Sequence, residues 1–101
     1  MNANYAQFAD ANVRLIILRA LAEEVNSSLN DAMLLATLEN FGHYRTKDYL
    51  RNQLAWLARE VGAVTTREAG TAVIATLTQA GLDHVERRRV LEGVQRPGLD
   101  V

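Results

Sequence analysis

The clearest hydrophobic pattern in the chain lies in the segment 46–62. Leucine and valine side chains recur there at steps of four, three and four residues, which is the spacing of one buried stripe on an α-helix. The stripe consists of Leu50, Leu54, Leu57 and Val61. Thr46 can cap the helix start through its hydroxyl, and Gly62 can end the helix in the left-handed conformation. The pattern predicts a helix over 46–61 with one buried face.

The opposite face of this predicted helix is polar and rich in long side chains. It carries Asp48, Arg51, Asn52 and Arg59, with Lys47, Tyr49 and Trp56 at its flanks. We expect Trp56 to be buried against the first helix or the following hairpin, because large aromatic side chains dominate small cores. The alternative is an exposed side chain that stacks on a ligand or docks a partner.

A first helix is predicted between Asn4 and Val25. Its broad apolar stripe consists of Phe8, Val13, Ile16, Ile17, Ala20, Leu21 and Val25. Asp10 can start the helix proper as its N-cap, which leaves Tyr5 and Phe8 on a loosely helical arm. The apolar run 15–18 is wider than one stripe needs, so this helix is expected to be buried on more than one side. A subunit contact and a well-covered core helix both explain that width.

A second helix is predicted over 30–41, with Ser28 or Asn30 as its cap. The residues that supply its buried face are Met33 or Leu34, together with Leu38 and Phe41. Gly42 ends this helix, and the sequence Gly-His-Tyr-Arg connects it to Thr46. Two helices joined by a short turn that contains glycine form the helix-turn-helix pattern.

After Gly62 the pattern changes from helical to extended. Two β-branched runs, 63–67 and 71–76, flank a turn that contains Gly70, which predicts a β-hairpin packed on the helices. Thr78 is expected to cap a fourth helix over 78–90, with Leu82 and Val85 facing inward. The sequence therefore predicts a mainly α fold with a small β-hairpin, a winged helix-turn-helix. We expect this domain to span 1–93 and to be followed by an extended or flexible tail, 94–101.

The segments LRNQLAWLAREVGAVTT and VIATLTQAGLDHVE, separated by the short turn with Gly70, resemble winged-helix proteins. They are most similar to a small winged-helix family of Mu-like phages and prophages, and the LAWLA and ATLTQAG parts are the most specific. The LIILRALAE run and the QRPG tail extend the resemblance from about Val13 to Pro97. One departure is Val61, which lies between the predicted helix and the Gly-Ala-Val that opens the wing, where many winged helices are one residue shorter. The resemblance therefore defines the start of the wing only to within one residue. The resemblance implies a fold and a phage context, and no reaction or operator.

The composition of the chain limits the number of domains and the kinds of partner that it can have. The chain has 101 residues, 49% of them hydrophobic, which suits one compact domain. Its formal net charge of -1 excludes a strong overall attraction to polyanions. Residues 1–42 hold five acidic and two basic residues, whereas residues 43–67 hold five basic and two acidic ones. That local excess suits phosphate, and a solvated surface of mixed charge explains it as well.

The sequence predicts neither an enzyme nor a metal or cofactor site. There are no cysteines, and His43 and His84 have no neighbours at metal-ligand spacing. His43 in the turn is expected to be a surface or phosphate-contacting residue. Glu23 and Glu24 suit a solvated helix end better than a catalytic pair. The start of the chain lacks the features of a signal peptide, and the longest apolar run is too short to span a membrane. We therefore expect a protein of the bacterial host cytoplasm with no membrane partner.

These patterns predict a protein that binds double-stranded DNA, as a phage or prophage transcriptional regulator or DNA-associated accessory factor, and that forms a homodimer. The helix after the turn is expected to enter the major groove, where Arg51 and Asn52 read bases. The residues expected to contact phosphate are Arg45, Lys47 and Tyr49, together with Arg67 at the tip of the wing. The alternative is a protein-interaction module in phage assembly that binds another phage protein. Asp48, within the proposed reading face, and the near-neutral net charge favour that alternative.

Overall fold

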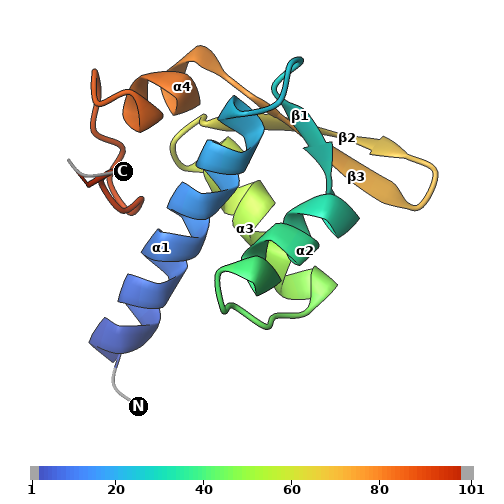
Figure 1. Cartoon of the computed structure of the whole chain (residues 1–101), viewed down its shortest axis with the longest axis horizontal. Coiled ribbons are helices and arrows are strands. Elements are labelled where there is room, and N and C mark those ends of the chain that lie inside the picture. Colours follow the sequence, from blue (N-terminus) through green and yellow to red (C-terminus); the bar gives the residue numbers. More distant parts are fainter. Residues whose placement is uncertain (1–2, 99–101) are drawn as a thin grey trace.

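The computed structural model of the chain describes residues 3–98, which form four helices and a three-stranded antiparallel sheet (Figure 1). The helices are α1 (Ala3–Ala22), α2 (Asp31–Asn40), α3 (Lys47–Arg59) and α4 (Gln79–Val85). The strands are β1 (Ser28–Asn30), β2 (Val64–Ala69) and β3 (Ala72–Leu77), arranged in the order β1-β3-β2. This mixed α/β domain is compatible with a winged helix-turn-helix.

Helix α1 begins and ends earlier than the sequence predicted. It is continuous from Ala3, so the expectation that Asp10 caps its start is wrong. It ends at Ala22, and Val25, expected in the buried stripe, is fully exposed. The apolar run 15–18 is buried inside the chain, where α1 contacts α2, α3, α4 and β3. Because its own chain covers this wide surface, the structure favours a well-covered core helix over a subunit contact at the run itself.

Helix α2 has the predicted position, and its buried face includes Leu34 and Leu38 as expected but not Phe41. Asn30 is its cap, with the side-chain oxygen accepting from the backbone N–H of Met33 at 2.8 Å. Of the two alternatives for the buried face, Leu34 is fully buried and Met33 is 55% exposed. The expected burial of Phe41 is wrong, since its side chain is 66% exposed. The helix ends at Asn40, so Phe41 leaves the helical periodicity that would turn it inward.

Helix α3 confirms the strongest sequence pattern. The Thr46 hydroxyl accepts from the backbone N–H of Tyr49 at 3.0 Å, which caps the helix start. The leucines of the stripe, Leu50, Leu54 and Leu57, are fully buried. Gly62 has a φ of 63°, the left-handed conformation expected at the helix end. These contacts fix the helix so that its polar face points away from the core.

The predicted hairpin is present, and a third strand extends it. Strands β2 and β3 pair from Val64↔Leu77 to Ala69↔Ala72 around a turn in which Gly70 has a φ of 63°. The hairpin therefore starts within one residue of the expected position. On the other edge of β3, the short strand β1 pairs Leu29 with Ala75. Three residues are too few to show a period of two, so the sequence pattern does not reveal β1.

The C-terminal part of the chain turns back onto the core. Helix α4 ends at Val85, five residues before the expected end, and Arg87 has a left-handed φ of 64°. Beyond the helix, Leu91 and Val94 are 4% and 6% exposed, so the chain packs on the core as far as Val94, the first residue of the expected extended or flexible tail. Their burial explains the early helix end, because a longer helix would carry them away from the core. Residues 99–101 of the expected tail lie outside the described residues.

Candidate nucleic-acid interface

The turn 41–46, helix α3 and the β2–β3 hairpin contribute adjacent parts of one surface. A hollow of about 340 Å³ lies between α3 and the hairpin. Its lining consists of Arg51, Leu54, Ala55, Thr66, Arg67, Glu68 and Val73. The surface therefore combines the N-terminal end of a helix with a neighbouring hairpin, and both carry basic side chains.

Arg51 does not extend away from the domain as expected. Its Nε donates to Asp31 Oδ2 at 2.8 Å, and its Nη2 lies 2.7 Å from the same oxygen. Nη2 also donates to the backbone oxygen of Thr71 at 2.6 Å. The guanidinium thus connects α3 to the start of α2 and to the hairpin. Its role in reading bases stays a prediction, and it requires the guanidinium to leave Asp31.

Asp31 is the buried half of this ion pair. Its side chain is 1% exposed, and Oδ1 accepts from the backbone N–H of Ala32 at 2.9 Å. Burial by itself raises the pKa of the carboxyl. The hydrogen bond and charge of Arg51, the charge of Lys47 and a backbone hydrogen bond from Val73 outweigh it, and the pKa of Asp31 lies below its usual value. The carboxylate is therefore charged at neutral pH and holds Arg51 in place.

Tyr49 also points into the domain. Its side chain is half-buried, and its hydroxyl donates to Asp10 Oδ1 on α1 at 2.5 Å. Burial, followed by this hydrogen bond and the charge of Asp10, raises the pKa of Tyr49 to about 12. Arg45 stacks over the ring, with its guanidinium carbon 4.5 Å from the centroid. The hydroxyl predicted to contact phosphate is engaged with α1, and the ring supports a neighbouring cation.

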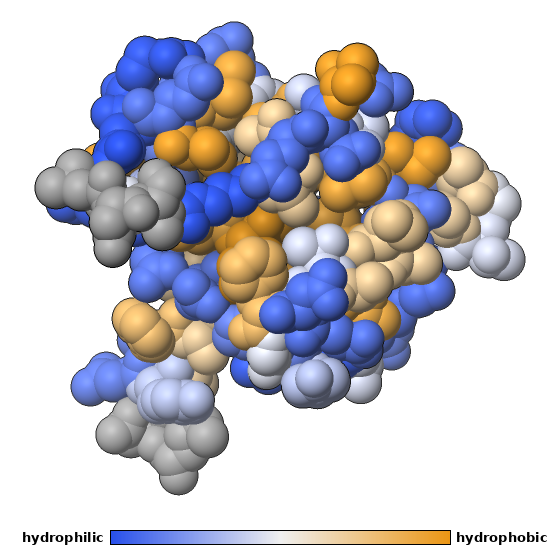
Figure 2. All heavy atoms as spheres, in the orientation of Figure 1, coloured by the Kyte–Doolittle hydropathy of each residue, from blue (hydrophilic) through white to orange (hydrophobic). Residues whose placement is uncertain are grey.

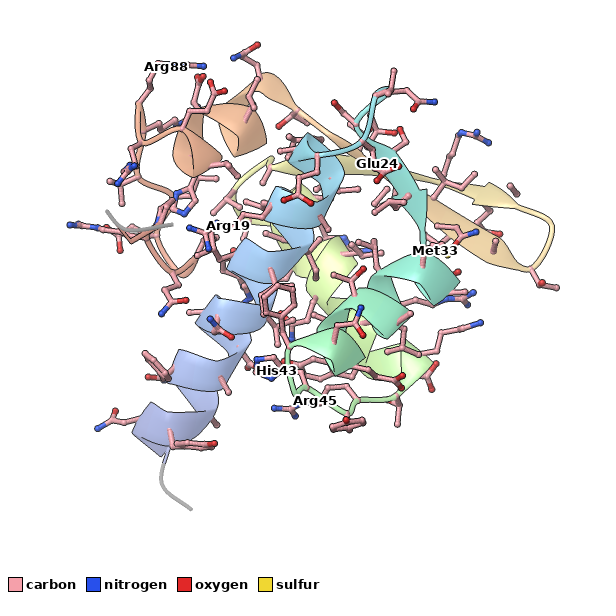
Figure 3. All side chains as sticks on the ribbon, in the orientation of Figure 1. Arg19, Glu24, Met33, His43, Arg45 and Arg88 are labelled. Atoms are coloured by element: carbon pink, nitrogen blue, oxygen red, sulfur yellow. The ribbon has the colours of Figure 1, made fainter. Side chains whose placement is uncertain are left out.

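His43 fixes the turn to α1. Its Nε2 donates to Asn12 Oδ1 at 2.7 Å, and Figure 3 shows His43 and Arg45 close together on this turn. Burial, followed by the nearby charge of Arg45, lowers the pKa of His43. The ring is therefore neutral at pH 7 and adds no positive charge to the surface. His43 is half-buried and makes a structural contact that its position in the sequence does not reveal.

Four of the predicted contact residues remain exposed on the surface: Arg45, Lys47, Asn52 and Arg67. The ion pairs within residues 3–98 are Arg51–Asp31, Arg88–Asp83 and Arg88–Glu86. The exposed cations Arg45, Lys47 and Arg67 take part in none of these ion pairs. Exposed acids, Asp48 and Glu68, lie near them in the sequence. Basic charge is therefore present on this surface, and it is not continuous.

Arg67 lies on a strand and not at the tip of the hairpin. It pairs with Ile74 and precedes the turn at Gly70 by three residues, so the expected place at the wing tip is wrong. It lines the hollow beside α3, where Arg51 also contributes. The structure thereby brings an arginine of the hairpin close to Arg51 of α3.

The far end of α3 is held by a second arginine. Trp56 is half-buried under Arg14 of α1, whose guanidinium carbon lies 3.7 Å from the ring centroid. Arg14 also donates to Gln53 Oε1 at 2.8 Å and to the backbone oxygen of Gly93 at 2.9 Å. The expectation that Trp56 is buried against the first helix is confirmed. α1, α3 and the C-terminal segment are locked together here.

Within residues 3–98, no group of three or more His, Cys, Asp or Glu side chains is placed to hold a metal ion. In the same part of the chain, no helix has the length and apolar character needed to cross a membrane. His84, one of the two histidines, is buried and accepts from the backbone N–H of Leu91 at 3.1 Å through Nδ1. Its other ring nitrogen contacts the backbone oxygen of Gln95 at 2.8 Å, and both contacts serve the fold.

Comparison with known proteins gives one informative relative. Over 84 residues, the chain is 38% identical to "Uncharacterized protein gp26" of Escherichia phage Mu. The similarity covers 83% of this chain and 85% of the phage protein. No family model matches the chain, and no solved structure matches it. The phage part of the resemblance seen in the sequence is confirmed.

Proposed function

The chain belongs to the family of the phage Mu protein gp26, and we propose that it is a winged-helix protein that binds double-stranded DNA. One observation carries the proposal: the helix after the turn begins at an exposed end that bears Arg45 and Lys47, directly beside a hairpin that bears Arg67. The order α1-β1-α2-α3-β2-β3, with β3 central, places the hairpin as a wing next to α3. In a phage or prophage, such a protein acts as a transcriptional regulator or a DNA-associated accessory factor.

Helix α3 enters the major groove by its N-terminal end in this proposal. Arg45, Lys47 and Arg67 contact phosphates, because each is exposed and makes no ion pair with a described carboxylate. Asn52 is the principal base-reading residue, since its exposed amide suits the two hydrogen-bonding atoms of adenine in the major groove. The near-neutral net charge makes the contribution of phosphate contacts modest and local.

Arg51 has a different place in the mechanism from the one the sequence suggested. Bound to Asp31 and to Thr71, it fixes the angle between α2, α3 and the wing. In this proposal, Arg51 holds α3 and the wing in position for DNA binding while no DNA is bound. It reads guanine only when the guanidinium exchanges the carboxylate of Asp31 for a base.

Alanine substitutions test the proposal by separating phosphate contacts from base reading. Lys47→Ala is expected to weaken binding to all duplexes alike and to lower the salt slope by about one. Asn52→Ala is expected to cost about 1–3 kcal/mol on the preferred site alone. Arg89→Ala is the matched control, because it removes one exposed positive charge beside α4, away from α3 and the wing. Equal effects of Lys47→Ala and Arg89→Ala would contradict the assigned surface.

A second candidate function is a protein-interaction module in phage assembly. It is favoured by the acids Asp48 and Glu68, which are exposed on the same elements as the proposed DNA contacts. A duplex would have to tolerate both carboxylates near its phosphates, whereas a protein partner with basic side chains would bind them. Absence of duplex binding at low salt, with the fold intact, would favour this function over DNA binding.

A further inference from the structure

An apolar groove lies between α1 and α2, and none of the residues proposed to contact DNA lines it. It has a volume of about 450 Å³. Ile16, Ala20 and Leu29 line it as buried or half-buried residues, while Met33 and Phe41 line it as exposed ones. Figure 2 looks onto this face and shows apolar residues near the crossing of α1 and α2, bordered by hydrophilic ones. The labelled Arg19, Glu24 and Met33 in Figure 3 lie around it.

Two exposed apolar side chains of this groove, Met33 and Phe41, are ones for which the sequence pattern allowed or predicted a place in the core. Met33 is 55% exposed and Phe41 is 66% exposed. Leaving large apolar side chains in water forgoes the free energy of their burial. Apolar patches rimmed by polar residues mark interaction sites on many soluble proteins. The groove therefore has the character of a surface that a second molecule covers.

The N-terminal arm of α1, residues 4–8, is a matching apolar projection. It extends beyond the body of the domain (Figure 1), and its residues are all exposed, including Phe8 at 61%. Phe8 and Arg19 are eleven residues apart, about three helical turns, so they lie on one side of α1. The side of α1 that carries Phe8 is thus the side that lines the groove.

We propose that the groove receives the N-terminal arm of α1 from a second copy of this chain, in a two-fold symmetric dimer with antiparallel α1 helices. A two-fold contact needs one surface that is complementary to itself, and α1 supplies both the arm and one wall of the groove. Glu23 and Glu24 follow the C-terminal end of α1 at the groove. Antiparallel packing places these carboxylates beside the positive N-terminal end of the second copy's α1. It also places Arg19 near the ring of Phe8 from that copy.

This dimer goes beyond the proposed DNA binding and does not depend on it. The interface lies at the arm and the groove, not at the buried run 15–18 that first suggested a homodimer. It also leaves out the apolar residue Val90 beside α4, which is 50% exposed. Measurements of mass without DNA therefore test the dimer separately from the proposed function.

Sedimentation equilibrium of the full chain, without DNA, tests the proposal. We expect a dimer at tens of micromolar, and a weakening of the dimer by about tenfold or more in Phe8→Ser and in Phe41→Ser. Tyr44→Ser and Val90→Ser are matched controls, because both side chains are exposed and neither lines the groove. A monomeric wild-type chain, or a dimer lost in a control but kept in Phe8→Ser and Phe41→Ser, would overturn the proposal.

Mixing the two variants tests the pairing of arm with groove. A homodimer of Phe8→Ser has two defective arms, and a homodimer of Phe41→Ser has two defective grooves. A mixed dimer keeps one intact arm in one intact groove, so the mixture is expected to contain more dimer than either variant alone. No gain on mixing would overturn the assigned contact. Thermal melting of each variant confirms that the fold is retained, as the exposure of Phe8 and Phe41 predicts.

Discussion

Removing the Arg51 side chain tests how much the ion pair between Arg51 and Asp31, which joins α2, α3 and the hairpin, contributes to stability. The side chain of Asp31 is 1% exposed in the wild-type fold. In Arg51→Ala, its carboxylate loses the guanidinium that lies within 3 Å of it. It keeps the hydrogen bond from the backbone N–H of Ala32. We expect the variant to fold with reduced stability, because an unpaired buried charge is unfavourable.

The magnitude follows from the burial of the two partners. An exposed ion pair contributes about 0–1 kcal/mol, and removing one partner of a fully buried pair costs about 3–5 kcal/mol. The Arg51 side chain is 37% exposed, so water screens part of the interaction. We therefore expect a loss of roughly 2 kcal/mol, which in a domain of this size lowers the melting temperature by roughly 8–16 °C. Lys47→Ala, at an exposed position nearby, is expected to stay within about 0.5 kcal/mol of wild type.

The pH dependence of this loss tests its cause. Asp31 has a folded-state pKa below the usual 3.8, so its contribution is complete above that value and is lost as the pH falls through the lower folded-state pKa. Urea unfolding is expected to show a constant difference between wild type and Arg51→Ala at neutral pH and a shrinking one below about pH 4. A double-mutant cycle with Asp31→Asn should be non-additive. An additive cycle, or a loss that does not change with pH, would refute this reasoning.

Three further variants test the packing and the polar contacts of α3 and α4. Leu54→Ala, in the fully buried stripe, is expected to cost about 2–5 kcal/mol in chemical unfolding, and an unchanged midpoint would show that the stripe is not core. The raised pKa of Tyr49 favours folding below its ordinary value near 10, and this contribution is lost as the pH rises towards about 12. Tyr49→Phe should therefore remove part of the alkaline loss of stability measured by urea unfolding, and an identical pH profile would contradict the contact with Asp10. Gly81→Ala is expected to lower the melting temperature, because its Cβ would lie 2.4 Å from the backbone oxygen of Ala63, and an unchanged melting temperature would contradict the close packing of α4 on that loop.

The elements that the sequence predicted well are those with local signals. The leucine stripe of α3 repeats over about two turns, and Thr46, Gly62 and Thr78 are capping residues whose action involves only near neighbours in the chain. The hairpin around Gly70 likewise has a turn residue between β-branched runs. In each case the contacts that define the element lie within a few residues, so one sequence is enough to predict it.

The features that the sequence did not predict depend on contacts between distant residues. Arg51 lies on the polar face of α3, and only the fold reveals that Asp31, twenty residues earlier, binds it. Tyr49 lies at the flank of the same polar face and was expected to contact phosphate. Only the fold reveals that its hydroxyl binds Asp10 on α1. Phe41 has the spacing of a core residue, yet α2 ends one residue before it. Periodicity identifies an apolar or polar face but does not identify its partner.

The most direct test of the central claim is a salt-dependent titration of the wild-type chain against random double-stranded DNA. The account predicts binding at low salt and a linear fall of the logarithm of the binding constant with the logarithm of the salt concentration. Arg45→Ala, Lys47→Ala and Arg67→Ala should each lower the slope by about one, whereas Arg89→Ala should leave it unchanged. No duplex binding at low salt by a folded chain, or slopes unchanged in the three variants, would contradict the claim that this surface binds DNA.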